Sequence, residues 1–380
     1  MKISVIESID AVAAADWNSL AHQDNPFLTH EFLAALERNQ CVGHHFGWLP
    51  RHLVAKDDSG RLLGAVPMYL KFNSYGEFVF DWSWADAYAR HGLNYYPKLV
   101  SGIPYTPATG PRILIHPNFV LDHAVMDSLI QYSIEYAQSL GVSSLHWLFP
   151  VKNDMDYLSK HGLLTRLGCQ YHWENRAYQD FNGFLVQFTS VKRKKVKQER
   201  RRVQEAGIKI EVLRGLDIDA QHWTIFSDFY ASTFARKGGV ATFNRAFFVE
   251  VGRTMGEDVV LTLAKHGTDY VAGALCYQGG GTLHGRHWGC TDQFNALHFE
   301  LCYYQGIEFC IAEQLRRFEP GAQGEHKISR GFLPEATWSA HWVTHPAFRA
   351  AIADFLQQEQ TMMESQMKEL HAHSPYKVAE

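Results

Sequence analysis

The 380-residue sequence lacks the patterns that mark disulfide-bonded, metal-binding and membrane-spanning proteins. Its six cysteines are scattered and form no Cys-x-x-Cys pair, so we expect reduced, mostly buried thiols rather than a disulfide framework or a zinc site. The 21 histidines include no His-Glu-x-x-His motif, and we therefore expect no metal. No apolar run approaches the roughly 20 residues that span a bilayer.

The sequence also lacks a large excess of charge of one sign, and it lacks the pattern of a targeting leader. The net charge is -4, and the composition, 46% hydrophobic and 20% charged, is that of a soluble globular protein. Glu7 and Asp10 interrupt the apolar start, so no basic leader with an unbroken apolar run is present. These features favour a cytoplasmic protein, and the length favours two domains or two similar halves.

The two halves of the chain repeat one pattern. The repeat is carried by LVAKDDSGRLLGAVPMY (53–69) and LTLAKHGTDYVAGALCY (261–277), each with Ala-Lys before a polar turn and Gly-Ala nine residues after that Ala. Each copy predicts a strand, a turn and a second strand. Helical patterns precede both hairpins, and a long helix leading to a short strand follows both. We therefore expect an α/β fold with two copies of one unit and a mixed sheet in each.

This duplication divides the chain into four parts. We expect an N-terminal unit at 1–179 and a C-terminal unit at 208–345. A basic helical connector is expected at 180–207, and a last helix that frays into a polar tail at 346–380.

The connector concentrates positive charge. Eight of the eleven residues from Lys192 to Arg202 are Lys or Arg, and Glu199 is the single acid among them. Like charges one turn apart destabilise a helix unless an anion compensates them. We therefore interpret the segment as a phosphate contact, for tRNA, a nucleotide, CoA or a lipid head group; the alternative is a solvated helix between domains. The residues proposed for this contact are Lys192, Arg193, Lys194, Lys195, Lys197, Arg200 and Arg201.

A second unusual segment is FEPGAQGEHKISRGFLP (318–334) near the end of the second half. Its three glycines permit positive φ angles or a close approach of backbone to a ligand. Glu325, His326 and Lys327 are three consecutive titratable residues, so their side chains must point in different directions from the loop. We interpret the segment as a substrate-binding loop, although such a composition also suits a loop that only reverses the chain.

The first half has its own candidate surface, an aromatic and turn-rich stretch between 74 and 114. Carboxylates and aromatic rings in irregular chain suit the binding of an acceptor substrate. The alternative is a folded loop that packs its own rings. The residues singled out are Asp81, Trp84, Asp86, Tyr105 and Arg112.

The order of elements resembles the acetyltransferase (GNAT) fold, and the tandem arrangement is similar to the Fem ligases. Four blocks look like those of the FemAB-like group described as peptidoglycan biosynthesis or recognition proteins: NPFLTHEFLAALE, IPYTPATGPRIL, LHFELCYYQGIEF and FEPGAQGEHKISRGFLP. The resemblance implies two tandem GNAT-like units with mostly antiparallel sheets. It also implies transfer of an aminoacyl group from aminoacyl-tRNA, or of another acyl group, to an amine, with a cell-wall peptide precursor as a candidate acceptor.

Two departures from these families concern the acyl donor and a lysine of the site. The stretch CTDQFNALHF (290–299), where a CoA-dependent enzyme carries a glycine-rich pyrophosphate loop, has no glycine, which makes acyl-CoA the less favoured donor. Fem enzymes carry a lysine in a Phe-Lys-x-Gly-Phe-like block, whereas this chain has Ile-Ser-Arg-Gly-Phe at 328–332. Lys327 and Arg330 are the nearest cations.

Acyl transfer to an amine requires stabilisation of an oxyanion and a route for the amine proton. We expect Lys327 or Arg330 to face the oxyanion or a phosphate, and Glu325 or His326 to transfer a proton or orient the acceptor. Further substrate contacts are expected from Arg286, His287, Trp288, Tyr303 and Tyr304.

Two other functions stay open on the sequence alone. One is an acyl-CoA-dependent N-acetyltransferase acting on a small-molecule or peptide amine. The other is a non-catalytic protein that binds cell-wall fragments or nucleic acid through the basic segment. We expect no tightly bound cofactor in any of these cases.

Overall fold

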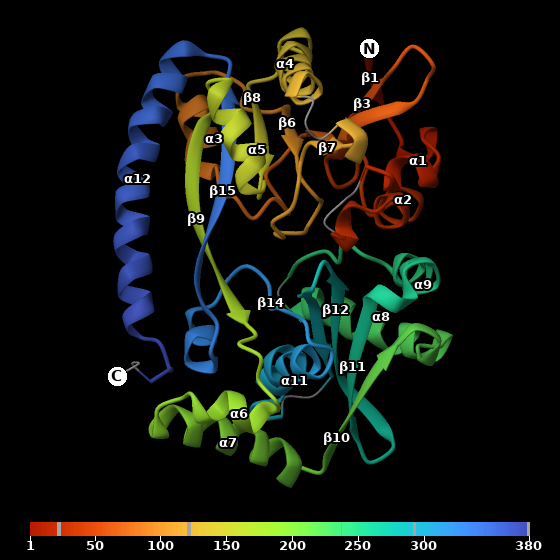
Figure 1. The fold of residues 1–380 in the computed structure, drawn as a ribbon, viewed down its shortest axis with the longest axis vertical. Helices are drawn as coiled ribbons and strands as arrows, with labels where there is room; N and C mark the ends of the chain where they lie inside the picture. The colour runs from red at the N-terminus through yellow and green to blue at the C-terminus, as the bar shows by residue number, and fades with distance from the viewer. Residues whose placement is uncertain (21–23, 120–122, 237, 292–293, 378–380) are drawn as a thin grey trace. The chain divides into compact units, whose positions relative to one another are not determined.

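The computed structural model describes residues 1–20, 24–119, 123–236, 238–291 and 294–377 (Figure 1). The chain forms two compact units, each made of two segments: Met1–Cys169 with Ala336–Ser365, and Gln170–Glu335 with Gln366–Glu380. The contiguous domains expected from the sequence differ from these units, because strands late in each half are built into the other unit.

The first unit contains most of the N-terminal elements and part of the C-terminal ones. Its helices are α1 (Ala14–Asn18), α2 (His30–Arg38), α3 (Trp82–Arg90), α4 (His123–Ser139) and α5 (Lys152–Lys160), together with most of α12 (Pro346–Ala372). Its strands are β1 (Lys2–Ile6), β2 (Trp48–Pro50), β3 (His52–Lys56), β4 (Leu62–Val66), β5 (Met68–Lys71), β6 (Lys98–Ser101), β7 (Leu114–Ile115) and β8 (Ser144–Leu148), with the first part of β9 (Leu164–Glu174) and most of β15 (Leu333–Val343).

These strands form two groups, in the orders β1-β3-β4-β7 and β15-β8-β6-β5-β2. Helix α4 packs its apolar side, including Leu129 and Ile130, onto the first group and completes the core of the unit. Thr29 caps α2, since its side chain accepts a hydrogen bond from the backbone N–H of Phe32.

The second unit places helices on both faces of one sheet. Its helices are α6 (Phe181–Val186), α7 (Ser190–Glu205), α8 (Ala220–Arg236), α9 (Arg245–Thr254), α10 (Leu297–Phe299) and α11 (Gln305–Ala312). Its strands are β10 (Ile208–Arg214), β11 (Val259–His266), β12 (Asp269–Gly279), β13 (Thr282–Cys290) and β14 (Arg317–Glu319), and the end of β9 completes the order β10-β11-β12-β13-β14-β9. A π-helical turn, η6 (Glu300–Tyr304), joins α10 to α11, and a 3₁₀ helix, η7 (Glu325–Arg330), follows β14.

The predicted duplication is confirmed in the strand pairing. β1 and β10 each lie antiparallel to the first strand of a hairpin, β3–β4 in one unit and β11–β12 in the other. Both hairpins shift register at the Ala-Lys step of the repeat, Ala55/Lys56 and Ala264/Lys265. The parallel pairs β6–β8 and β13–β14 also correspond, and most other neighbours are antiparallel.

The glycine of the repeated Gly-Ala step has a steric role in both copies. A Cβ atom on Gly64 would lie 2.9 Å from the carbonyl oxygen of Leu114. A Cβ atom on Gly273 would lie 2.9 Å from Leu263 and 3.0 Å from Phe226. Real Cβ contacts are longer than this, so each glycine is retained because the chain packs directly against it.

The late strands of the two repeats are exchanged. β9 follows the first repeat but pairs with β14, through Glu174 opposite Arg317 and Trp173 opposite Phe318. β15 follows the second repeat but pairs with β8, with His341 opposite His146. This exchange is the physical reason why the compact units are not continuous in sequence.

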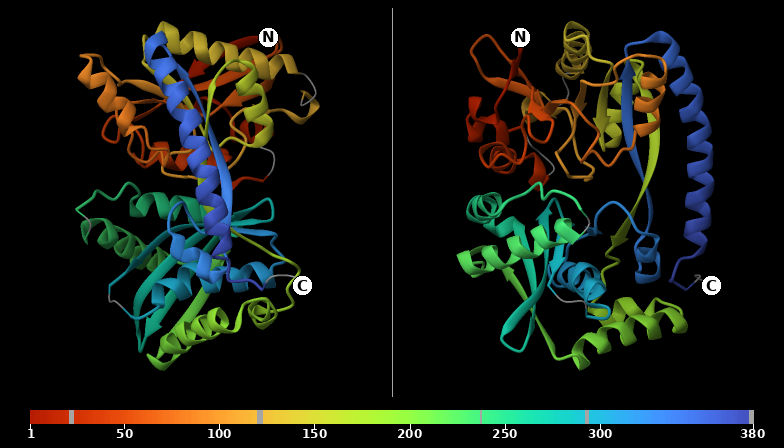
Figure 2. Two further views of the ribbon diagram at one scale, coloured as in Figure 1. Left: turned by 90° about the vertical axis from the view of Figure 1, so that its left-hand side faces the viewer. Right: turned by 180° about the vertical axis from the view of Figure 1, so that it is seen from behind.

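The connector and the C-terminal tail also have defined places. α7 packs on β10 and η7 inside the second unit, through Val196 and Val203 among others. α12 runs to Ala372 as one helix (Figure 2), where the sequence favoured a frayed tail. After it, Tyr376 packs against Phe188 and donates a hydrogen bond to the carbonyl oxygen of Gly331.

Candidate functional site

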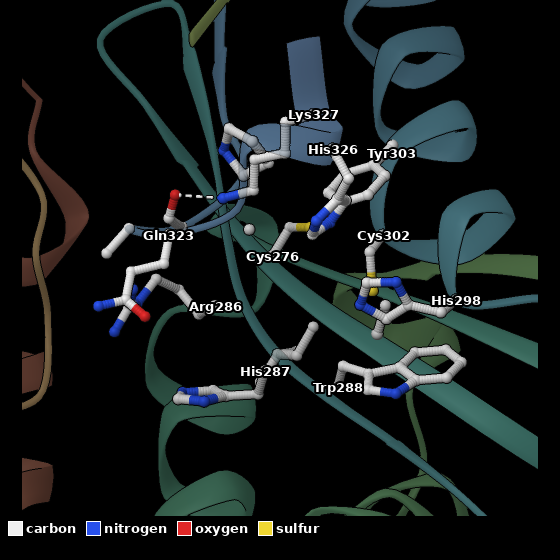
Figure 3. Close-up of a pocket in the computed structure, with 16 residues that line it drawn as sticks. Cys276, Arg286, His287, Trp288, His298, Cys302, Tyr303, Gln323, His326 and Lys327 are labelled. Carbon is white, nitrogen blue, oxygen red and sulfur yellow. Dashed lines mark hydrogen bonds between the residues drawn. The ribbon is translucent and has the colours of Figure 1, made fainter. Parts of the chain in front are cut away.

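A pocket in the second unit gathers many of the residues expected to meet a substrate (Figure 3). Its volume is about 280 Å³, and it lies between β12, β13, the helix around η6, and the loop that precedes η7. The side chains labelled in the figure are Cys276, Arg286, His287, Trp288, His298, Cys302, Tyr303, Gln323, His326 and Lys327.

The loop over this pocket is shaped by glycines, as the sequence indicated. Gly321, Gly324 and Gly331 have φ angles of 92°, 117° and 97°, which residues with a side chain rarely adopt. The turn at Gly321 directs its carbonyl oxygen to Lys327, whose Nζ donates a hydrogen bond of 2.6 Å to it. Lys327 is 2% exposed, and Figure 3 shows this bond at the pocket wall.

The charge of Lys327 is poorly compensated. Burial above all, together with the nearby guanidinium of Arg286, lowers the pKa of Lys327 to about 7. Among the described residues that line the pocket, none is Asp or Glu. The site therefore favours an incoming negative charge and disfavours a second ammonium group.

Tyr303 and His326 form a hydrogen-bonded pair beside Lys327. The Tyr303 hydroxyl lies 2.9 Å from Nε2 of His326. Burial raises the pKa of Tyr303 well above its usual range, so the phenol keeps its proton. Burial, Arg330 and Lys327 all lower the pKa of His326, so the imidazole is neutral at pH 7. The pair can accept one proton and return it.

The other two residues of the predicted catalytic loop point elsewhere. Glu325 is exposed and is not part of the pocket lining. Arg330 is buried; its guanidinium lies 3.4 Å from the centroid of the Phe299 ring and donates a 2.7 Å hydrogen bond to Glu199 and another to the carbonyl oxygen of His326. Arg330 thus anchors η7 from behind the pocket.

Glu199 joins three elements at this place. It is the single acid within the basic run of α7, and its carboxylate accepts hydrogen bonds from Arg330 in η7 and from the hydroxyl of Tyr304 in η6. Tyr304 is fully buried and lies outside the pocket lining. The structure therefore gives Tyr304 an anchoring contact, whereas its neighbour Tyr303 faces the pocket.

Strand β13 contributes a run of three predicted residues. Arg286 and Trp288 alternate along the strand with His287, which packs among the rings of Tyr230 and Phe243 at centroid distances of 5.1 and 4.9 Å. The ring of Trp288 packs edge-on against His298, with 5.2 Å between the ring centroids (Figure 3). All three β13 side chains are half-buried and border the pocket.

The residues singled out in the first half are mostly engaged inside the first unit. The guanidinium of Arg112 is fully buried and donates to four backbone carbonyl oxygens. The hydroxyl of Tyr105 donates to the carbonyl oxygen of Cys41, and Trp84 packs edge-on against His341. Asp86 is exposed on α3. These four do not converge on one surface.

Asp81 belongs to a buried ionic network. Burial alone would raise the pKa of Asp81, but the ammonium group of Lys98, which is hydrogen-bonded to it, lowers that pKa to about 2. Lys98 also donates to Glu77 at 2.8 Å, and the hydroxyl of Tyr95 donates to Asp81 at 2.6 Å. The residues of this network belong to the first unit, and none of them lines the pocket of the second unit.

The basic run divides between internal and solvent-facing residues. Arg200 forms hydrogen bonds with both Glu300 and Glu308, at 2.8 to 3.2 Å, and is a structural cation. Lys192 and Arg193 are half-buried. The exposed basic residues are Lys194, Lys195, Lys197, Arg201 and Arg202, of which Arg201 lies 3.5 Å from Glu205.

Sequence reasoning did not single out four residues that line the pocket: Cys276, His298, Cys302 and Gln323. The sequence spacing could have indicated two of them. His298 and Cys302 are four residues apart, which places them on one face of a helix, and Cys302 is next to Tyr303. Burial raises the pKa of the Cys302 thiol well above its usual value, so this cysteine is not an activated nucleophile.

Two kinds of feature are missing from the described part of the chain. There, no three His, Cys, Asp or Glu side chains are arranged to hold a metal ion. No described helix has both the length and the apolar character needed to cross a membrane.

Comparison with known proteins agrees with this architecture. A family model described as peptidoglycan biosynthesis/recognition, FemAB-like, matches residues 8–378. The chain belongs to the FemAB-like family. No curated protein sequence matches the chain.

Solved structures resemble this FemAB-like chain in fold. FemX is 11% identical, with a TM-score of 0.53 over 93% of this chain and 100% of that one. The C-terminal domain of a putative lysylphosphatidylglycerol synthetase from Agrobacterium fabrum is 10% identical, with a TM-score of 0.53 over 92% and 96% of the two chains. At such identities the likeness shows the fold alone, and it confirms the tandem GNAT-like organisation expected from the sequence.

Proposed function

We propose that this FemAB-like chain is an N-acyltransferase that forms an amide between an activated acyl group and an amine, with a peptidoglycan precursor as the candidate acceptor. Family membership supports the class of reaction. The observation that carries the proposal is Lys327, a buried lysine that lines a pocket whose described lining has no carboxylate and whose pKa is lowered to about 7.

Such a site suits the transition state of acyl transfer. When an amine nitrogen attacks a carbonyl carbon, negative charge develops on the carbonyl oxygen, and a cation in a pocket whose described lining has no carboxylate stabilises that charge more than it stabilises the neutral ground state. The same cationic surroundings lower the pKa of an entering amine, as they lower that of Lys327. The amine is therefore favoured in its neutral, nucleophilic form.

The remaining proton transfer falls to Tyr303 and His326. The attacking nitrogen forms a bond to the carbonyl carbon and loses a proton to the Tyr303–His326 pair. The bond from carbon to the carrier oxygen or sulfur then breaks, and the pair returns the proton to that atom. Arg330 and Glu199 hold η7 in place behind these groups.

The carrier of the acyl group is a separate part of the proposal. The exposed cations of α7, Lys194, Lys195, Lys197, Arg201 and Arg202, are a suitable contact for a phosphodiester carrier such as tRNA. Acyl-CoA remains the second candidate for the carrier. The alternative function, a protein that binds without turnover, has no acyl carrier. The cytoplasmic location expected from the sequence also remains a proposal.

The test follows label from two donors, bulk tRNA charged with labelled amino acids and labelled acetyl-CoA, into acceptors of a bacterial extract. We expect transfer by the full chain and a loss of about 100-fold or more in Lys327→Met. Lys209→Met, which removes an exposed lysine on β10 of the same unit, is the matched control and should retain full turnover. Transfer from neither donor, or full turnover in Lys327→Met, would contradict the proposal.

A further inference from the structure

Among the described residues, three lysines are almost completely buried, and they differ in what surrounds them. Lys71 and Lys98 in the first unit are 0% exposed, and Lys327 in the second unit is 2% exposed. Lys98 donates hydrogen bonds to the carboxylates of Glu77 and Asp81. Burial alone would lower the pKa of Lys98, but these two carboxylates hold it above its ordinary value. Lys98 is therefore kept as a cation inside an ion network.

Lys71 shares the lowered pKa of Lys327 without sharing its access. Burial lowers the pKa of Lys71 to about 7. Its ammonium nitrogen donates hydrogen bonds to the side chain of Asn73 at 3.2 Å and to the carbonyl oxygen of Tyr75 at 3.1 Å, and it lies 3.8 Å from the centroid of the Trp48 ring. Burial and a low pKa therefore do not by themselves make an amine reachable from outside.

Lys327 is the buried lysine that borders the pocket of the second unit. The pocket volume of about 280 Å³ is large enough for a small acyl group, and Figure 3 shows the side chain of Lys327 among the lining residues. Its Nζ donates a 2.6 Å hydrogen bond to the carbonyl oxygen of Gly321. Because a carbonyl oxygen only accepts hydrogen bonds, this contact does not occupy the lone pair of a neutral amine.

The groups around Lys327 keep its neutral form populated. Since the pKa is lowered to about 7, mainly by burial, both protonation states are present near neutral pH. The groups that interact electrostatically with Lys327 come from β9, β13, η6 and η7 itself: His172, Arg286, Cys302 and His326. None of these four is a carboxylate, and burial raises the pKa of the Cys302 thiol, which stays protonated at pH 7. The carboxylate of Glu319, at the end of β14, acts on Arg286 and His172.

From this geometry we propose that Lys327 is itself an acyl acceptor, a modification site that a small activated acyl group reaches through the pocket. The neutral Nζ attacks the carbonyl carbon of an oxygen ester, thioester or acyl phosphate, and a C–N bond forms. The bond from that carbon to the leaving oxygen or sulfur breaks, and the amine proton passes to the leaving group through the Tyr303–His326 pair. The products are a neutral amide on Lys327 and a free alcohol, thiol or phosphate.

This reaction goes beyond the proposed function, because it needs no acceptor amine. The two roles of Lys327 belong to its two protonation states: the ammonium form faces an oxyanion, and the neutral form is acylated. One consequence rests on the proposed function. An acylated Lys327 has lost its positive charge, so a chain that meets an acyl donor without an acceptor would lose its transfer activity.

Incubation of the full chain with p-nitrophenyl acetate, a small neutral ester, tests the proposal, and peptide mass spectrometry gives the rate of acetylation at each lysine. At about pH 7.5 we expect Lys327 to react at least tenfold faster than Nα-acetyl-lysine amide in the same solution, because an ordinary lysine of pKa about 10.4 is neutral there in only roughly one molecule in a thousand. The rate at Lys327 should rise about tenfold per pH unit below pH 7 and level off above about pH 8.

Lys71 and Lys98 are internal controls in the same experiment. Lys71 matches the lowered pKa of Lys327 and Lys98 matches its burial, but neither lines the pocket. Both should be acetylated at least tenfold more slowly than Lys327. His326→Gln should slow the acetylation of Lys327 at least threefold, whereas His373→Gln, which removes an exposed histidine after α12, should leave the rate unchanged.

The proposal is overturned if Lys327 reacts no faster than the free lysine derivative, if Lys71 reacts as fast as Lys327, or if His326→Gln reacts like the unchanged protein. It is also overturned if the advantage of Lys327 persists in a chain unfolded by urea. These results are independent of the label-transfer experiment. Acetylation of Lys327 in a chain that transfers no label would leave the modification site standing and remove the proposed function. Label transfer by a chain whose Lys327 is not acetylated would do the reverse.

Discussion

Removal of the Glu199 carboxylate should destabilise the second unit more than any exposed charge change on the same helix. Glu199 is 7% exposed, and Arg330, which its carboxylate binds at 2.7 Å, is 3% exposed. Glu199→Ala leaves that guanidinium buried without its counter-ion and leaves the Tyr304 hydroxyl without its acceptor. Breaking one side of a buried ion pair costs about 3–5 kcal/mol, and a lost hydrogen bond adds about 1 kcal/mol.

The matched control lies near the end of the same helix, α7. Glu205 is exposed and pairs with Arg201 across one helical turn, so Glu205→Ala should cost less than about 0.5 kcal/mol. The double variant Glu199→Ala with Arg330→Met removes both charges from the interior. It should recover more than half of the stability that Glu199→Ala loses, because no uncompensated ion is left.

Urea unfolding followed by circular dichroism measures the overall effect, and hydrogen exchange with peptide mass spectrometry assigns it to α7, η6 and η7. Peptides from the first unit should exchange at unchanged rates. A loss below about 1 kcal/mol in Glu199→Ala would refute the reasoning, as would a double variant no more stable than the single one. Either result would mean that solvent reaches Arg330 more easily than its burial indicates.

Three further predictions concern packing, pH and salt. Gly273→Ala should lower the free energy of unfolding by about 1–3 kcal/mol in a urea titration, since its Cβ would lie 2.9 Å from a leucine side chain; unchanged stability would contradict the packing role of the repeat. The unfolded chain binds more protons than the native one between the native pKa of Lys327, about 7, and its ordinary value of 10.5, so stability should rise with pH across that window. That rise should be smaller in Lys327→Met, and equal slopes would contradict the lowered pKa. Binding of tRNA should weaken steeply with salt, and changing Lys194, Lys195 and Lys197 to Gln should flatten the log-log slope by on the order of 0.9 per lost contact; a slope unaltered in a filter-binding titration would remove α7 from the interface.

The sequence by itself determined the duplication and the irregular, glycine-shaped backbone of the loop at 318–334. The Ala-Lys and Gly-Ala steps recur because each is set by local geometry, a register shift in one hairpin and a chain contact that excludes a Cβ atom. The glycines of 318–334 likewise predicted positive φ angles, which are properties of single residues. A family resemblance based on such blocks was therefore sufficient for the family and the fold.

Only the tertiary structure decided which titratable residues share one space. Lys327 and Arg330 are three residues apart in one 3₁₀ helix, yet one borders the pocket and the other is held behind it by Glu199, 131 residues earlier in the chain. From the sequence we expected Arg112 to contact a substrate, but its guanidinium donates its hydrogen bonds to backbone carbonyl oxygens of its own unit. The exchange of β9 and β15 is equally invisible in the sequence, because either strand satisfies the same local pattern, and which sheet it joins depends on contacts between residues far apart along the chain.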